Sequence, residues 1–174
     1  NANAAIGGLT TLSVTGTSSL NADVTSSSTQ VYTGNVTIDN DITLSTTNSQ
    51  ITFTGTVNSE ATEGNDLTIS VGTSEVEFDS AVGGSAALGA ISITGDLDLD
   101  ANITSATSLS VSADTNLAAD VTTSGTQTYG DDAASDATVT DGSRTLQGST
   151  IQFVSTVTGT TAESDDLTIT GALN

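Results

Sequence analysis

The sequence repeats itself on two length scales, and this feature constrains its fold more than any other. The matches between the two halves are TQVY at 29–32 with TQTY at 126–129, ITF at 51–53 with IQF at 151–153, TV at 56–57 with TV at 156–157, DLTI at 66–69 with DLTI at 166–169, and SVTG at 13–16 with SITG at 92–95. The interval between the two TQxY motifs nearly equals the interval between the two DLTI motifs. A repeat with a much shorter period relates ISI at 91–93 to LSV at 109–111. Nested periods of this kind indicate a repeat architecture in which each unit stacks on its neighbours.

Short segments that alternate apolar and polar residues recur along the chain. They include VTI at 36–38, ITL at 42–44, LTI at 67–69, VEF at 76–78, ISI at 91–93 and LDL at 97–99. Alternation with a period of two is typical of a half-buried β-strand, and the Gly, Asn, Asp and Ser residues between the segments favour turns. We expect the apolar residues of these segments to face inward, Val31 among them, and we expect Tyr32 and Tyr129 to occupy equivalent positions near a corner.

Short strands with a superperiod of roughly 18 to 25 residues predict an all-β fold, a β-solenoid of roughly eight turns with about 4.8 Å between turns. A β-sandwich is the alternative, but it does not explain the short echo nested within the long one. We predict one solenoid segment over 1–174, with repeat units at about 1–90 and 91–174.

The amino-acid composition favours β-strands, and the net charge limits which partners the protein can bind. Ser and Thr together account for 59 of the 174 residues, and the formal net charge is −20 because 21 acidic residues face one basic residue, Arg144. Phosphate recognition needs Lys and Arg, so nucleic acid is excluded as a partner. The sequence has no apolar run of about 18 residues, so we expect no membrane insertion.

The residues that usually carry out catalysis are missing. The chain has no His, Cys or Lys, so the common general bases, thiol nucleophiles and amine nucleophiles are unavailable. The many serines have no base to activate them. We therefore predict that the protein is not an enzyme and has no organic cofactor.

Two acidic groups are candidate Ca²⁺ ligands, because oxygen-only ligand sets suit this ion. The first comprises Asp96, Asp98, Asp100 and Asn102, which would project from one face of a strand. The second comprises Asp131, Asp132 and Asp136, with Asp141 nearby in the same loop region. The competing interpretation of both is a solvated acidic surface. Asn35 and Asn102 lie in Asn-x-Thr sequences, which makes them candidate glycosylation sites.

The two ends of the chain resemble neighbouring parts of one pattern. AIGG at 5–8 is similar to AVGG at 81–84, and Leu167 is similar in context to Leu67. If Asn174 were followed directly by Asn1, Leu167 would precede Ile6 by nearly the same interval as Leu67 precedes Val82. We therefore expect the solenoid to continue past both ends, either in a longer chain or by head-to-tail stacking with other copies.

The TQTY motif at 126–129, the LTI motif at 67–69 and the AVGG motif at 81–84, within a Ser/Thr-rich background, resemble the β-strand repeats of filamentous-haemagglutinin-like and autotransporter-like bacterial surface adhesins. This resemblance covers essentially the whole chain. It implies an exported, extracellular β-solenoid stalk at the cell surface. We expect a structural segment of a filament or stalk; the alternative is an adhesin segment that binds glycans or another cell surface.

Overall fold

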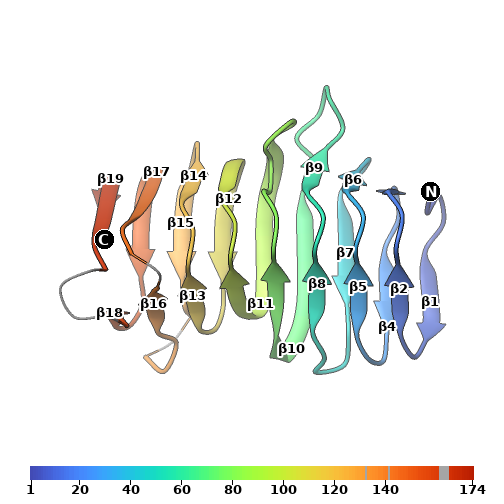
Figure 1. Ribbon diagram of the computed structural model, residues 1–174, viewed down its shortest axis with the longest axis horizontal. Coiled ribbons are helices and arrows are strands. Elements are labelled where there is room, and N and C mark those ends of the chain that lie inside the picture. Colours follow the sequence, from blue (N-terminus) through green and yellow to red (C-terminus); the bar gives the residue numbers. More distant parts are fainter. Residues whose placement is uncertain (132, 141, 161–164) are drawn as a thin grey trace.

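The computed structural model describes residues 1–131, 133–140, 142–160 and 165–174, and all of its regular elements are β-strands (Figure 1). The chain coils along one long axis, with its two termini at opposite ends. The fold is a β-solenoid of about 8 turns with roughly 21 residues per turn. Every strand pairing among the described residues is parallel, which confirms the solenoid and excludes a sandwich of antiparallel sheets.

Each turn contributes strands to three positions, and equivalent strands of successive turns pair with one another. The first position holds β1 (Ile6–Leu9), β4 (Val24–Ser26), β7 (Ile42–Ser45), the start of β10 (Leu67–Phe78), the first part of β11 (Leu88–Leu99), the end of β12 (Ile103–Val111), β15 (Thr126–Tyr129), the end of β17 (Arg144–Phe153) and the end of β19 (Leu167–Leu173). The second holds β2 (Leu12–Val14), β5 (Gln30–Tyr32), β8 (Ile51–Phe53), the ends of β10 and β11, β13 (Thr115–Leu117), β16 (Ala137–Val139) and β18 (Val157–Gly159). The third holds β3 (Ser18–Leu20), β6 (Val36–Ile38), β9 (Val57–Ser59), Val82, the start of β12, β14 (Val121–Thr123) and the starts of β17 and β19.

The length of one turn varies within the range that the sequence predicts. Asp98 and Asn116 are register partners in successive turns and lie 18 residues apart. Thr52 and Glu77 are register partners in a longer turn and lie 25 residues apart. The strand register is kept because the extra residues lie in corners and loops, where insertions disturb the parallel ladder least.

Inward-facing apolar side chains form one continuous core, and the predicted inward orientation holds for most of the strand segments. Val31 is an exception. It is only half-buried and faces outward, whereas its neighbours Gln30 and Tyr32 are fully buried. The prediction for Val31 was wrong because a hydrogen-bonded Gln–Tyr pair, rather than the β-branched residue between them, fills the interior here.

The buried Gln–Tyr pair occurs twice with the same hydrogen bonds. Gln30 Nε2 donates to the backbone oxygens of Val24 (3.3 Å) and Ser45 (2.9 Å), and Tyr32 donates its hydroxyl proton to Gln30 Oε1 (2.9 Å). In the second copy, Gln127 Nε2 donates to the backbone oxygen of Gln147 (2.8 Å) and Tyr129 donates to Gln127 Oε1 (2.9 Å). Each Gln thereby ties its own turn to the next, and its burial costs little because its polar atoms have partners. Burial raises the pKa of both tyrosines, so both hydroxyls stay protonated donors.

Aromatic rings stack along the core from one turn to the next. Tyr32, Phe53 and Phe78 form one stack in which successive ring centroids lie 5.1 Å apart. Tyr129 and Phe153 form a second stack with the same spacing. In-register parallel strands place equivalent side chains directly above one another, so a column of rings follows from the register.

The long sequence repeat does not correspond to a whole number of turns. Tyr32 lies at the second strand position, and its sequence equivalent Tyr129 lies at the first. In the same way, Leu67 lies at the first position and its equivalent Leu167 at the third. Every matched segment is thus displaced backward by one strand position, and the three positions provide similar environments.

Glycine columns occupy two corners where backbones of successive turns come very close. Gly16, Gly34 and Gly55 lie between the second and third strand positions, and a Cβ added to Gly34 would lie 2.4 Å from the backbone carbon and oxygen of Gly16. Gly125, Gly148 and Gly171 form the other column, between the third and first positions. No side chain fits between adjacent glycines of a column without displacing backbone.

Among the residues that the structure describes, no helix is long and apolar enough to cross a membrane.

Candidate functional site

A strongly acidic surface lies on the outward side of β10 and β11. In-register pairing places Glu75 opposite Asp96 and Glu77 opposite Asp98. Asp79 and Asp100 directly follow these strands. We refer to these six carboxylates as the acidic ladder. Alternation along each strand directs them outward while Val76, Phe78, Leu97 and Leu99 face the core.

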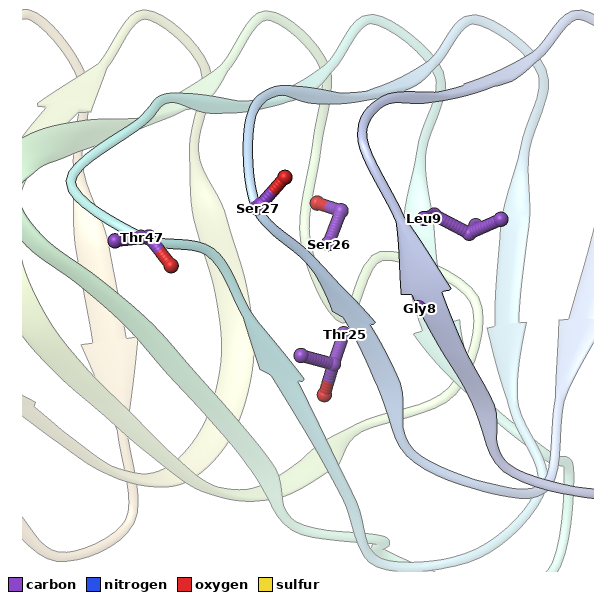
Figure 2. Close-up of a pocket in the computed structure, with 6 residues that line it drawn as sticks. All are labelled: Gly8, Leu9, Thr25, Ser26, Ser27 and Thr47. Atoms are coloured by element: carbon purple, nitrogen blue, oxygen red, sulfur yellow. The ribbon is translucent and has the colours of Figure 1, made fainter.

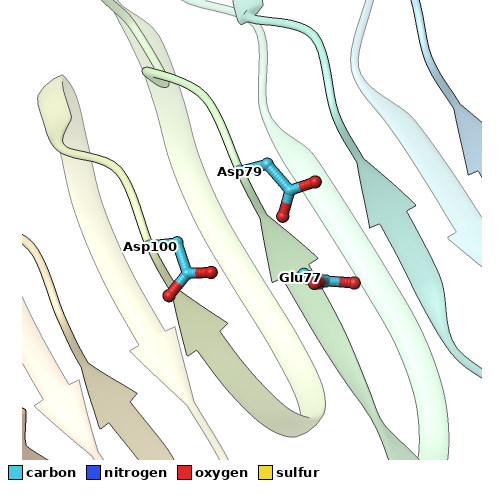
Figure 3. A group of neighbouring side chains, drawn as sticks. All are labelled: Glu77, Asp79 and Asp100. Atoms are coloured by element: carbon cyan, nitrogen blue, oxygen red, sulfur yellow. The ribbon is translucent and has the colours of Figure 1, made fainter.

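Glu77, Asp79 and Asp100 form the tightest group in the acidic ladder, with one carboxylate oxygen of each within 4.8 Å of the others (Figure 3). Figure 3 shows Asp79 and Asp100 side by side from neighbouring turns, with Glu77 beneath Asp79. Such a group offers three oxygen ligands, whereas Ca²⁺ takes about six to eight. The remaining ligands would have to come from the second oxygens of these carboxylates, from water or from another molecule.

Hydrogen bonds already engage part of this group. Glu77 Oε2 accepts from Gln50 Nε2 (2.9 Å) and from Thr52 Oγ1 (3.1 Å), and Gln50 Nε2 also donates to Glu75 Oε1 (2.9 Å). Partial burial raises the pKa of Glu77, and the neighbouring Asp79 carboxylate raises it further. Partial burial likewise raises the pKa of Asp96.

The structure brings only one of the first four predicted Ca²⁺ ligands, Asp100, into the tight group. The other three accept hydrogen bonds from the following turn. Asp96 Oδ1 accepts from the backbone nitrogen of Asp114 (3.1 Å) and Asp98 Oδ1 from Asn116 Nδ2 (2.8 Å). Asn102 Oδ1 accepts from the backbone nitrogen of Asp120 (3.0 Å). Glu77 and Asp79 were not predicted, although one turn of average length separates them from Asp98 and Asp100.

The second predicted group is only partly described. Asp131 is exposed, and Asp132 and Asp141 lie outside the described residues. Asp136 Oδ1 accepts hydrogen bonds from Thr156 Oγ1 (2.7 Å), Ser155 Oγ (3.2 Å) and the Thr156 backbone nitrogen (3.3 Å). The hydrogen bonds from Thr156 and Ser155 lower the pKa of Asp136. Ca²⁺ binding by these residues stays a prediction.

Many acidic and amide side chains at the corners share one structural role. Their side-chain oxygen accepts a hydrogen bond from a backbone N–H of a neighbouring turn. The described residues with this contact are Asp23, Asn35, Asp41, Asn48, Asn58, Asp66, Asp96, Asn102, Asp114, Asp120, Asp136 and Asp165. Each one satisfies a backbone donor that the ladder leaves unpaired, so part of the high negative charge follows from how the turns are joined.

Two variants of Asp120 separate the hydrogen-bonding role of such a side chain from the effect of its charge. Its Oδ1 accepts from the backbone nitrogen of Thr145 at 2.8 Å in a partly buried corner. Asp120→Ala is expected to lower the free energy of unfolding by about 1–3 kcal/mol, because the Thr145 N–H loses its partner. Asp120→Asn removes the same charge but keeps the acceptor oxygen, so its unfolding midpoint in urea should stay close to that of the parent. Equal losses in the two variants would contradict the hydrogen-bond role.

The two candidate glycosylation sites are exposed at corners. The Asn35 side-chain oxygen accepts from the backbone nitrogen of Thr56 (3.2 Å), and that of Asn102 accepts from Asp120. Both side chains therefore take part in joining successive turns. Glycosylation of either stays a prediction.

A shallow hollow of about 180 Å³ lies beside the first turns and is lined by Gly8, Leu9, Thr25, Ser26, Ser27 and Thr47 (Figure 2). Its side chains are hydroxyls and one leucine. Thr25 Oγ1 lies 2.9 Å from Ser45 Oγ, and Ser26 Oγ donates to the backbone oxygen of Ser28 (2.5 Å). These lining residues include no general base or charged group that could activate a serine.

Comparisons with known proteins do not assign the chain to a family. No protein-family model matches the sequence. No curated protein and no solved structure matches it significantly.

Proposed function

We propose that this chain is a structural segment of an extracellular, cell-surface filament or stalk that extends head to tail by strand pairing across its ends. The observation that carries the proposal is that apolar core residues at both ends of the solenoid are only partly covered. At the N-terminal end these are Ile6, Leu12 and Val14, and at the C-terminal end Phe153, Leu167 and Ile169. A further turn stacked on either end would cover them.

The N-terminal end is hollowed, which fits this arrangement. Ala2, Ile6, Leu12, Val14 and Tyr32 are among the residues that line an open depression of about 200 Å³. At the opposite end, Val157 is 37% exposed and Leu173 is 61% exposed. Partly exposed apolar side chains beside unpaired strand edges favour association through those edges.

The aromatic residues support a scaffold rather than glycan recognition. The chain has two tyrosines, three phenylalanines and no tryptophan. Tyr32, Phe53, Phe78 and Tyr129 are buried in the core, and Phe153 packs against it. Exposed aromatic rings are the usual anchors of binding surfaces, and all of these rings are used for stacking between turns. The extracellular location rests on the resemblance to adhesin repeats.

Association of the purified chain tests this function. Sedimentation velocity should show species larger than the 17.2 kDa monomer, in proportions that rise with protein concentration. Added NaCl should promote association because it screens the repulsion between chains of charge −20. Monomers at every concentration and salt level would contradict the proposal.

A pair of variants makes the test specific to the end of the solenoid. Leu173→Asp places a charge on the exposed C-terminal end and should abolish association. Thr94→Asp adds the same charge at an exposed position in the middle of the solenoid and should leave association unchanged.

A further inference from the structure

We propose that a second copy of this chain stacks on the first in one fixed register, rotated by one strand position, so that β2 of the second copy pairs with β19 of the first. This inference rests on the proposed head-to-tail assembly and specifies its partner and contacts. The internal repeat provides the template, because pairings inside the chain involve segments whose sequence equivalents lie at its two ends.

The first template is the pairing of β10 with β11. Thr68 pairs with Ser92 in register, and the leucine and isoleucine on either side pair likewise. DLTI at 66–69 recurs at 166–169, and SITG at 92–95 matches SVTG at 13–16. The equivalent contact between two copies therefore places Thr168 of one copy opposite Ser13 of the next.

A second template gives the same rotation. Val57 forms a parallel bridge with Val82. By the sequence match, Val157 corresponds to Val57 and Ile6 to Val82. Ile6 of the second copy would then lie above Val157, which moves a strand of the first position onto the second.

A third contact agrees with the other two. Leu20 corresponds to Leu99, because each follows the matched SVTG or SITG segment by the same interval. Phe78 pairs with Leu99 and Ala2 forms a parallel bridge with Leu20, so Ala2 takes the place of Phe78. Since Phe78 stacks on Phe53, Ala2 of the second copy would lie above Phe153. All three contacts thus require the same displacement by one strand position.

The exposure of the end residues matches what this register would bury. Val157 and Leu173 are 37% and 61% exposed. Their interior counterparts Val57 and Val76 are both 0% exposed. Val76 pairs with Ile51 as Leu173 pairs with Ile151. Val157 and Leu173 are therefore residues of the type that fills the core, but they stay partly exposed in the single chain.

Charge is distributed so that these ends can approach each other. All 21 acidic residues lie between positions 23 and 166, and none lies in 1–22 or 167–174. Strand edges are usually protected from pairing by charged side chains. The edge strands β2 and β19 carry none, although the rest of the chain is strongly acidic.

The glycine columns give an independent reason for the rotation. The column Gly125–Gly148–Gly171 ends at the C-terminal turn, between the third and first positions, and the column that begins at Gly16 starts at the N-terminal turn, between the second and third. Stacking without rotation would place these columns at different corners. Rotation by one position places Gly16 of the second copy above Gly171 of the first and joins the two columns into one.

Gly16→Ala tests the contact between columns. A Cβ at Gly16 meets nothing within 4 Å in the single chain, whereas one at Gly34 meets the Gly16 backbone at 2.4 Å. The variant should melt at or above the parent temperature and lose the species larger than the monomer. Ser13→Ala, a small change on the neighbouring edge strand, should keep them. Undiminished association of Gly16→Ala would overturn the proposed contact.

Cysteine cross-linking tests the register directly, because the natural chain has no cysteine. In-register parallel neighbours lie about 4.8 Å apart, within disulfide reach. A mixture of Ser13→Cys and Thr168→Cys chains should give a mixed disulfide dimer on oxidation. A mixture of Ser13→Cys and Thr158→Cys chains, which would pair if the copies stacked without rotation, should not.

The outcomes separate this inference from the function on which it rests. A disulfide between positions 13 and 158 would overturn the register and leave head-to-tail assembly standing. The same conclusion would follow if both mixtures associated but formed neither the 13–168 nor the 13–158 disulfide. Monomeric behaviour of the parent chain in sedimentation would overturn both.

Discussion

Phe53→Ala is expected to lower the free energy of unfolding by about 3–5 kcal/mol, the usual cost of removing a fully buried aromatic ring. Phe53 is 0% exposed and is the middle ring of the stack, 5.1 Å from both Tyr32 and Phe78. Its loss leaves a cavity between the turns above and below and removes both ring contacts. Turns of a solenoid contact only their neighbours, so the damage cannot be spread over a wider core.

Urea unfolding followed by circular dichroism measures this loss. Thr54→Ala serves as the control, because Thr54 is the exposed neighbour of Phe53 and its truncation should change stability by no more than about 0.5 kcal/mol. Similar unfolding midpoints for the two variants would show that the aromatic stack does not stabilise the solenoid.

Gly34→Ala is expected to have the second largest effect, a loss of about 3 kcal/mol at the upper end of the cost of overpacking. The new Cβ would lie 2.4 Å from the carbon and oxygen of Gly16 and 2.7 Å from the nitrogen of Thr17. These are backbone atoms of the preceding turn, so no side-chain rotation can relieve the contact. The two turns would have to separate at this corner.

Gly16→Ala is the matched control for stability, since Gly16 belongs to the same column but its Cβ would meet nothing within 4 Å. It should equal the parent in stability or exceed it by up to about 1 kcal/mol, because alanine restricts the unfolded chain. Comparable destabilisation by both variants would contradict the close approach as the cause.

The sequence predicts the solenoid, its turn length and most of its inward residues, because period-two alternation and repeat spacing are local signals. Val31 shows the limit of that reasoning. Hydropathy favours burying Val31, but Gln30 and Tyr32 satisfy each other and the Gln30 amide reaches the backbone oxygen of Ser45 in the next turn. A contact with the next turn decides the orientation, and a strand pattern alone does not contain it.

The rotation of the long repeat was also beyond sequence analysis. Tyr32 and Tyr129 are equivalent in sequence and in hydrogen bonding, yet they lie at different strand positions. Because the length of a turn varies, the turns between these two tyrosines cannot be counted until the register is known. Because the strand positions provide similar environments, the same motif can pack equally well at the first and at the second position.

The acidic residues were predictable as an outward surface but not in their pairing. The alternation around Leu97 and Leu99 identifies the exposed side of that strand. Whether Asp98 faces Glu77 or another residue depends on the length of the preceding turn, and that length varies. The corner hydrogen bonds, such as that of Asp120 with Thr145, were missed for the same reason.

Electron microscopy of the purified chain at high concentration and high salt tests the central claim most directly. Continuous filaments should appear, with an axial rise per copy on the order of 40 Å, since the fold has about 8 turns spaced about 4.8 Å apart. Each copy should be rotated relative to the last by about a third of a turn, in accordance with three strand positions per turn. Isolated short particles of uniform length, without end-to-end contacts, would contradict the claim.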